Sequence, residues 1–353
     1  MQGLAGPEEG ASLLNGLYVA AHGSELDCGL YLFQPFEGRW KGELLAAVEE
    51  LTALAWHPSL QVVYGVSGSG AGLAHAWKVS GEGTSVLSEL PTNGLEPCHV
   101  AVSPDGRLLV VSNYESGTLS SWWLAPDGSL SGSAQLVELS GSSVDSERQR
   151  SSHPHQVTFA EGLVYVVDLG ADMVRVFEES ELASPHALTP LREVATPAGT
   201  GPRHMAMLPF GEVALSGELS DVVLRGRLDL PACDWQQSHC GEVSALPTDA
   251  RNYPGDIQSS TDGRFVYVAI RGRGTVASFA IGAGQPQLVG ERESSVLWPQ
   301  HLLVTGEELL VAGRDLSRVV ELPLTGGLPG PSRTLFECPG PSWLLLARET
   351  SRS

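Results

Sequence analysis

The chain has 353 residues, with 21 basic and 41 acidic side chains and a formal net charge of -20. This charge argues against binding to nucleic acid or to anionic membranes, because both are negative as well. Apolar residues make up 42% of the chain, but their uninterrupted runs are short, so we expect a core and no membrane-spanning helix. The N-terminal residues MQGLAGPEEG lack the basic and apolar segments of a signal peptide. Five scattered cysteines form neither a disulfide framework nor a zinc motif, so we expect a cytoplasmic protein.

One phrase recurs along the whole chain. It combines a proline, an alternating apolar stretch, a polar turn and a second apolar run, followed by a third alternating segment. Its copies begin at Thr52, Pro97, Pro154, Pro202, Pro254 and Pro299, with a shortened one at Pro341. The starts lie 42 to 57 residues apart, a spacing typical of four-stranded propeller blades.

The apolar residues alternate with a period of two, which predicts strands rather than helices. Asp-Gly turns at Ser103–Gly106 and Ser260–Gly263 are typical of tight hairpins. Leu17–Phe33 resembles the end of a copy, and Pro341–Ala347 resembles a beginning. The sequence therefore predicts an all-β fold for residues 1–353, a single seven-bladed β-propeller of four-stranded antiparallel blades. Pairing of its N- and C-terminal strands would close the ring and remove the open sheet edges.

A serine-rich, charged segment, Leu139–Ser152, interrupts the repeat and accounts for the longest interval. It is either a surface excursion without function or a rim loop over the central opening. In the second interpretation it carries Arg148, Gln149 and Arg150 toward a ligand.

Two positions of the repeat should face the same end of the central channel. The first is the pair after each proline: Cys98 and His99, His155 and Gln156, Arg203 and His204, Gly255 and Asp256, Gln300 and His301, Ser342 and Trp343. The second is the residue that ends the next strand: His22, Val66, Asn113, Asp168, Glu218, Arg271 and Arg314. Charged groups beside the axis are costly unless they are paired or used.

Several of these residues have a structural interpretation. Asn113 and Asp168 suit the turns that follow strands, because their side chains bind nearby backbone. His99, His204 and His301 recur at one position, which fits either a repeated structural hydrogen bond or contact with substrate.

Arg203, Glu218 and Arg271 come from adjacent blades, and His155 comes from the blade before. Together they supply an acid or base, a carboxylate and two cations, as expected for water attack on a carbonyl with stabilisation of the oxyanion. The arginines also suit an anionic substrate. A metal at His153 and His155 is the rival interpretation, but the sequence shows no third ligand, so we expect neither metal nor cofactor.

The motifs that carry a family resemblance are PCH…SPDGR…SNY (Pro97–Tyr114), ERQRSSHPHQ (Glu147–Gln156), DLGAD (Asp168–Asp172), GTGPRH (Gly199–His204), GEL (Gly217–Leu219), DIQSSTDGRFVYVAIRG (Asp256–Gly272) and PSW (Pro341–Trp343). In these motifs the chain resembles the seven-bladed propeller lactonases, the bacterial 6-phosphogluconolactonase type related to the fungal carboxymuconate cyclase. The resemblance implies a site made of His155, Arg203, Glu218 and Arg271.

The chain departs from the family pattern at three positions. Gly217 and Ile270 stand where the family commonly has asparagine, and Gln300 stands where it often has arginine. Phosphate recognition therefore stays open, although Arg314 of the same blade offers a replacement cation.

We expect a lactone hydrolase that acts on a small anionic sugar lactone, with 6-phosphogluconolactone favoured, and a monomer or weak homodimer. Either Glu218 or His155 would activate water. The further residues expected to bind substrate are Arg148, His99, His204, Asp256, His301, Arg314 and Trp343. Two alternatives remain, a muconate-type lactonising cycloisomerase and a non-catalytic propeller that binds a ligand or a protein partner.

Overall fold

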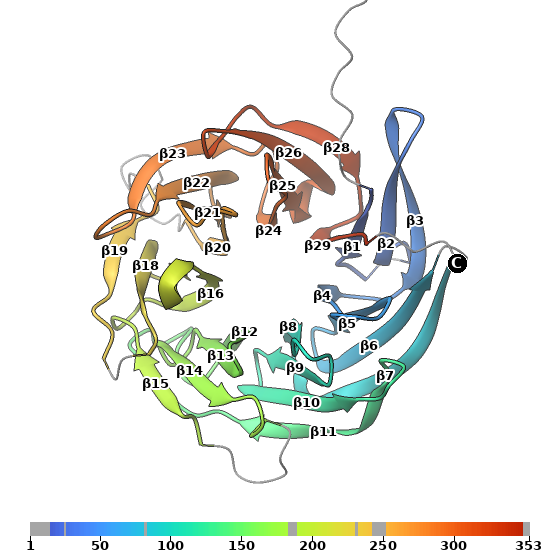
Figure 1. Cartoon of the computed structure of the whole chain (residues 1–353), viewed down its shortest axis with the longest axis horizontal. Coiled ribbons are helices and arrows are strands. Elements are labelled where there is room, and N and C mark those ends of the chain that lie inside the picture. Colours follow the sequence, from blue (N-terminus) through green and yellow to red (C-terminus); the bar gives the residue numbers. More distant parts are fainter. Residues whose placement is uncertain are drawn as a thin grey trace, which may run out of the picture.

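The structure is a computed structural model that describes residues 15–24, 26–80, 83–182, 189–229, 232–241 and 252–348. Seven β-sheets are arranged in a ring around a central axis (Figure 1). The helices of the described residues are 3-10 turns, η1 (Pro209–Gly211) and η3 (Arg314–Leu316), and none could cross a membrane. The MQGLAGPEEG segment, on which the prediction about a signal peptide rests, lies outside the described residues.

Each sheet is one blade, and its strands run antiparallel from the axis outward. The split blade consists of β29 (Pro341–Leu346), β1 (Leu17–Ala21), β2 (Gly29–Phe36) and β3 (Arg39–Ala47). The next three blades consist of β4 (Leu51–Trp56), β5 (Val62–Ser67), β6 (Ala71–Ser80) and β7 (Gly83–Leu95); β8 (Pro97–Val102), β9 (Leu108–Asn113), β10 (Thr118–Leu124) and β11 (Leu130–Glu138); and β12 (Pro154–Ala160), β13 (Leu163–Asp168), β14 (Met173–Glu178) and β15 (Arg192–Ala195). The remaining blades consist of β16 (Pro202–Met207), β17 (Glu212–Gly217), β18 (Val222–Arg227) and β19 (Gln236–His239); β20 (Pro254–Ser259), β21 (Phe265–Ile270), β22 (Thr275–Ala280) and β23 (Gln287–Glu293); and β24 (Pro299–Val304), β25 (Glu308–Gly313), β26 (Arg318–Thr325), β27 (Leu328–Pro329) and β28 (Arg333–Glu337).

The two ends of the described chain close the ring. β1 pairs with β29 on one side and with β2 on the other, so the C-terminal strand becomes the innermost strand of the N-terminal blade. This confirms the predicted seven-bladed propeller and its closure. One sheet has five strands rather than four, because β26 pairs with both β27 and β28.

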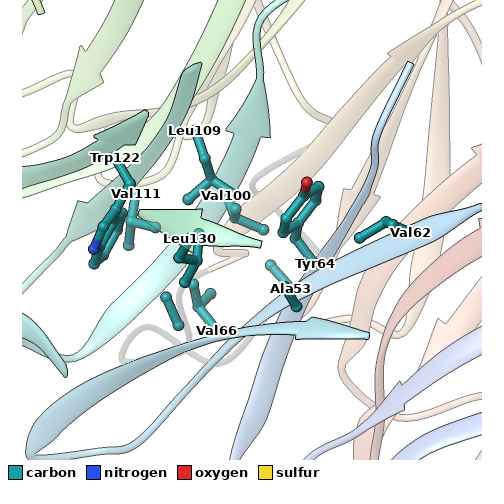
Figure 2. Close-up of a cluster of buried hydrophobic side chains, with 11 residues drawn as sticks. Ala53, Val62, Tyr64, Val66, Val100, Leu109, Val111, Trp122 and Leu130 are labelled. Carbon is teal, nitrogen blue, oxygen red and sulfur yellow. The ribbon is translucent and has the colours of Figure 1, made fainter. Parts of the chain in front are cut away.

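The core is divided among the interfaces between blades. Each of the seven interfaces contains a cluster of buried apolar side chains from both neighbours. In Figure 2, Tyr64 and Val66 of β5 lie across from Val100 and Val111 of the next blade. Every residue of β5 is buried, which explains why the middle strands have continuous apolar runs rather than strict alternation.

The strand pairing corrects the second predicted position by one residue at Asn113 and Asp168 and by two residues at Val66. Each inner-strand proline, or Leu51 in the first copy, lies opposite the last residue of the second strand. The row that follows the second strand is His22, Gly68, Tyr114, Leu169, Glu218, Arg271 and Arg314. Asn113 and Asp168 belong to the row before it, and the first copy begins at Leu51 rather than Thr52. The apolar pattern ends before these residues, so it could not fix their register.

The one-residue difference changes what these side chains do. Asn113 and Asp168 are fully buried. Asp168 accepts hydrogen bonds from the backbone N–H groups of His153 and Ala171, at 2.8 and 3.0 Å. Asp168 therefore binds nearby backbone, as expected for a turn residue. Asn113 instead donates from Nδ2 to the hydroxyls of Thr118 and Ser120, at 3.1 and 2.8 Å.

Ring closure gives a prediction for Leu344, which is buried at the seam opposite Val19. Leu344→Ala should lower the free energy of unfolding by roughly 2–5 kcal/mol, because it removes a packed side chain from this interface. Denaturant unfolding measures the loss. Leu346→Ala changes a partly exposed residue of the same strand and should have a much smaller effect. Equal losses in the two variants would contradict a packed seam.

Candidate functional site

A pocket of about 430 Å³ opens at one end of the channel, where the inner strands begin and the second strands end. All seven blades contribute to its wall. The lining residues are His22, Thr52, Gly68, Ser69, Glu96, Pro97, Cys98, Tyr114, Arg148, His155, Arg203, His204, Glu218, Arg271, Trp298, Gln300, Arg314, Ser342 and Trp343.

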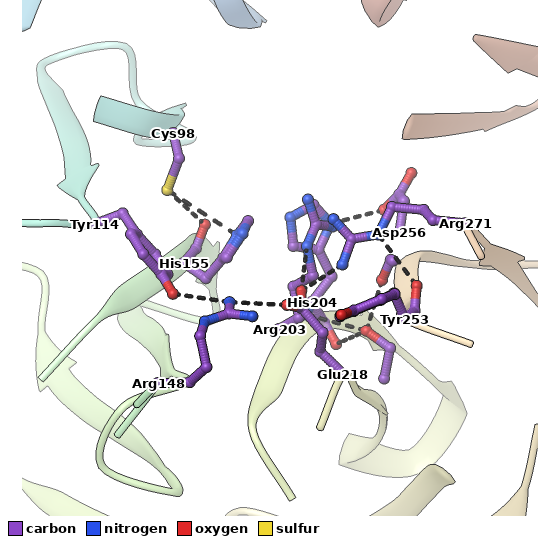
Figure 3. A network of polar contacts seen from close by, with 12 residues as sticks. Cys98, Tyr114, Arg148, His155, Arg203, His204, Glu218, Tyr253, Asp256 and Arg271 are labelled. Atoms are coloured by element: carbon purple, nitrogen blue, oxygen red, sulfur yellow. Dashed lines mark hydrogen bonds and ion pairs between the residues drawn. The ribbon is translucent and has the colours of Figure 1, made fainter. Parts of the chain in front are cut away.

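A buried carboxylate joins three arginines on one side of this pocket (Figure 3). Glu218 is 4% exposed, and its Oε1 accepts a hydrogen bond from Arg148 Nη2 at 2.9 Å. Its Oε2 accepts a hydrogen bond from Arg271 Nη2 at 2.5 Å and lies 3.2 Å from Arg203 Nε. Three cations thus share one anion, which leaves an excess of positive charge in a strongly acidic protein.

The arginines determine the ionisation of this carboxyl group. Burial raises the pKa of Glu218, but Arg271, Arg203 and Arg148 outweigh that effect and lower it to about 2. The carboxylate is therefore a weak base whose oxygens are both engaged by arginines. Because both of its oxygens contact arginines, Glu218 is suited to hold those arginines in place.

Arg203 has unused hydrogen-bonding capacity. Its side chain is 3% exposed, and neither Nε nor Nη1 has a hydrogen-bond partner among the described residues. Burial and the charge of Arg271 lower the pKa of Arg203 to about 10, so it remains a cation at neutral pH. Buried N–H groups without partners are uncommon in folded proteins, and these belong to a pocket-lining residue.

The segment between β11 and β12 places Arg148 in the pocket. Arg148 Nη2 also donates to the hydroxyl of Tyr114, at 3.0 Å. Gln149 is buried and donates from Nε2 to the carbonyl of Leu169, at 2.9 Å. Arg150 is exposed and does not line the pocket. The rim loop therefore brings one of its three predicted residues to the site.

His155 lies beside Tyr114 and Cys98 on the adjoining wall (Figure 3). Its Nδ1 is 4.0 Å from Cys98 Sγ. Burial, followed by the charge of Arg203 and the effects of His204 and Arg271, lowers the pKa of His155 well below its usual range. The imidazole is neutral at neutral pH, as a proton acceptor must be. Burial raises the pKa of Cys98 to about 12, so Cys98 is not an activated thiolate.

The other predicted histidines form the layer under the pocket. His204 lies at the pocket floor, and its Nδ1 is 2.8 Å from Asp256 Oδ1. Asp256 also accepts from the backbone N–H of Leu302 and lies 3.7 Å from His301 Nε2. His99, Asp256 and His301 are buried and do not line the pocket, so their predicted contact with substrate stays untested.

Aromatic and polar groups complete the far wall. Trp343 lines the pocket and lies against His301, with ring centroids 4.0 Å apart. The guanidinium carbons of Arg271 and Arg314 lie 5.0 and 5.6 Å from the ring centroid of Trp298. Trp298 Nε1 and Gln300 Oε1 are buried without hydrogen-bond partners among the described residues.

Glu96, Trp298 and Tyr114 line the pocket but were not predicted from the sequence. In most blades the residue before the inner strand has a positive φ, for example 53° at Glu96 and 51° at Trp298. The equivalent residues are glycine in two blades, Gly201 and Gly340. Large side chains are unusual in this conformation, and those of Glu96 and Trp298 reach the pocket. Their position just before a proline was the available signal, and Tyr114 was missed through the one-residue register error.

The pocket has two chemically different halves. The arginine half, formed by Arg148, Arg203, Arg271 and Arg314, covers the four blades from β12 to β28. The hydroxyl half covers the split blade and the blades from β4 to β11. Its polar lining residues include Ser342, Thr52, Ser69 and Glu96. Among the described residues, no group of three or more His, Cys, Asp or Glu side chains could hold a metal ion.

Comparison with known proteins connects this chain to a family. A family model described as a lactonase with a 7-bladed beta-propeller matches residues 40–346. A 6-phosphogluconolactonase from Bacillus subtilis is 29% identical over 314 residues, which cover 82% of this chain and 88% of that protein. A 6-phosphogluconolactonase from Formosa agariphila is 26% identical over 243 residues, which cover 64% of this chain and 66% of that protein.

Solved structures share the fold. A periplasmic gluconolactonase from Pseudomonas aeruginosa has a TM-score of 0.83 at 22% identity, with 94% of this chain and 98% of that chain covered. A virginiamycin B lyase from Staphylococcus aureus has a TM-score of 0.57 at 11% identity, with 80% and 83% covered. At these identities the likeness shows the fold alone, and the second protein's name indicates a different reaction on a similar scaffold.

The low pKa of Glu218 gives a testable link between pH and stability. The folded state favours the carboxylate, so the contribution is present above pH 4.5 and is lost as the pH falls toward 2. Glu218→Gln should therefore lower the free energy of unfolding at pH 7 by roughly 3 kcal/mol, and by much less at pH 3. Denaturant titrations at both pH values measure this. Glu147→Gln, on the exposed part of the rim loop, is the control, and a pH-independent effect of Glu218→Gln would contradict the prediction.

Proposed function

We propose that this chain, which belongs to the lactonase family of seven-bladed β-propellers, hydrolyses an anionic sugar lactone, with 6-phosphogluconolactone as the favoured substrate. The observation that carries the proposal is the excess of arginine charge around Glu218, together with the buried Arg203, whose Nε and Nη1 have no hydrogen-bond partner among the described residues although Nε is ion-paired with Glu218. Such donors would bind an anion more strongly than a neutral ligand, because a hydrogen bond between charged groups is stronger than one between neutral groups.

The chemistry of the lactone suits the arginine half. In 6-phosphogluconolactone the carbonyl carbon and the carbon that bears the phosphorylated arm both flank the ring oxygen. The developing oxyanion and the phosphate therefore face the same side of the sugar. Four arginines on one half of the pocket could serve both. Arg314, which is partly exposed and 3.1 Å from Asp315, lies farther from Glu218 along the ring and is the candidate for the phosphate.

We assign His155, Arg203, Arg271 and Glu218 separate roles in hydrolysis. Water adds to the lactone carbonyl and gives up a proton to His155, while Arg203 and Arg271 stabilise the tetrahedral oxyanion. The bond from that carbon to the ring oxygen then breaks, and the imidazolium returns the proton to the leaving oxygen. The product is the open-chain acid. Glu218 holds the arginines and does not act as the base.

The choice of His155 over Glu218 follows from the charges. Glu218 has a pKa of about 2 and is engaged on both oxygens. His155 is neutral because of burial and the charges of Arg203 and Arg271. An anion bound to these arginines would offset their charge and make His155 a better proton acceptor.

The difference between the arginine half and the hydroxyl half also helps to choose between a lactone hydrolase and a muconate cycloisomerase. A muconate carries a carboxylate at each end, and one of them would face the half that contains Glu96. This favours a sugar lactone over a diacid. A non-catalytic propeller remains the second alternative, and turnover separates it from an enzyme.

A panel of substrates tests the proposed reaction. The protein should hydrolyse 6-phosphogluconolactone with a higher kcat/KM than glucono-δ-lactone, and it should not cyclise cis,cis-muconate. Release of acid at constant pH, corrected for spontaneous hydrolysis, measures the first two, and loss of ultraviolet absorbance measures the third. The proposal would be overturned if the protein accelerated the hydrolysis of neither lactone.

Arg203→Ala should lower kcat for 6-phosphogluconolactone on the order of a hundredfold, because it removes a preorganised donor for the oxyanion. Arg150→Ala, which removes an exposed arginine of the rim loop, is the matched control. Wild-type turnover in Arg203→Ala, measured by the same assay on folded protein, would rule out the assigned role.

A further inference from the structure

The hydroxyl half of the pocket contains one charged acceptor. Glu96 lines the pocket and is half-buried. Its hydrogen bonds within the described residues are made by its backbone, to Gly70 and from Tyr114. Burial and the charges of Glu115 and Glu50 raise the pKa of Glu96, and His153 lowers it by a smaller amount.

Neighbouring hydroxyls on this half are already engaged as donors. Ser342 Oγ donates to the carbonyl of Leu51 at 2.9 Å. Thr52 Oγ1 donates to the carbonyl of Glu50 at 3.1 Å. These hydroxyls can still accept a hydrogen bond, but Glu96 is the charged acceptor among the described lining residues on this side, and hydrogen bonds to a charged acceptor are stronger.

The arginines opposite determine how a ligand would lie. An anionic group that binds the arginine half directs the rest of a sugar ring across the pocket. In a gluconolactone the secondary hydroxyls lie on the side of the ring opposite the ring oxygen. These hydroxyls would then face Glu96, whereas a second anion at that position would be repelled.

We propose that Glu96 is a specificity-determining residue that accepts hydrogen bonds from the sugar hydroxyls and rejects ligands with an anion at that end. This inference rests on the proposed function for the class of ligand. It adds a contact that Glu218 and its three arginines do not provide.

Equilibrium binding tests the assignment without requiring turnover. Calorimetry would compare the wild-type protein, Glu96→Gln and Glu115→Gln. The probes are inorganic phosphate, 1,5-anhydroglucitol 6-phosphate and cis,cis-muconate. Glu115 is exposed and does not line the pocket, so its variant controls for the loss of one negative charge nearby.

Glu96→Gln should weaken binding of the sugar phosphate by roughly five- to tenfold, because a charge-assisted hydrogen bond becomes a neutral one. Binding of phosphate should change little, and binding of muconate should strengthen. Glu115→Gln should resemble the wild type with all three probes.

Two results would contradict the inference, and the experiment distinguishes them. An unchanged affinity of Glu96→Gln for the sugar phosphate, or equal changes in Glu115→Gln, would overturn the role of Glu96 alone. Absence of binding of both phosphate and the sugar phosphate to the wild type would overturn the inference together with the proposed anionic substrate.

Discussion

The site depends on the interaction of one buried carboxylate with three arginines. Without Glu218, the cations of Arg148, Arg203 and Arg271 would repel one another in a poorly solvated pocket. With it, they are held together and still carry a net positive charge. The same contact keeps the pKa of Glu218 near 2 and helps to keep His155 neutral through the arginines. In the proposed reaction, anion binding, oxyanion stabilisation and the protonation state of the base would therefore all depend on this one interaction.

The propeller makes this interaction possible because it brings distant parts of the chain to one axis. Arg148 and Arg271 contact Glu218 across 70 and 53 residues of sequence. Arg203 lies on the inner strand β16, Glu218 and Arg271 directly follow the second strands β17 and β21, and Arg148 lies in the segment before β12. The interface clusters fix the blades relative to one another. The layer of His204, Asp256 and His301 beneath the pocket supplies a polar floor whose groups bind mainly to each other. A rigid scaffold of this kind suits a site whose charges must be preorganised.

The repeat made the ring, its closure and the cluster around Glu218 predictable from the sequence. Arg203, Glu218 and Arg271 stood out because they place long charged side chains at repeat positions beside the axis, where such groups are costly unless they are paired or used. Tyr114 did not, because the apolar pattern could not distinguish two adjacent residues at a strand end. Glu96 and Trp298 were missed because their access to the pocket depends on a positive φ, which no apolar period encodes. His99, Asp256 and His301 were expected beside the substrate; they are buried and are not among the residues that line the pocket, and their contact with substrate stays a prediction. They lie in the layer below.

The most direct test of the central claim is a crystal structure of the protein with 6-phosphogluconate bound. The account predicts an anionic oxygen of the ligand within hydrogen-bonding distance of Arg203 and Arg271, with Glu218 still bridging the arginines. The account would be contradicted by a ligand bound in the pocket without contact to either arginine, or by one whose anionic groups lie on the side of Glu96.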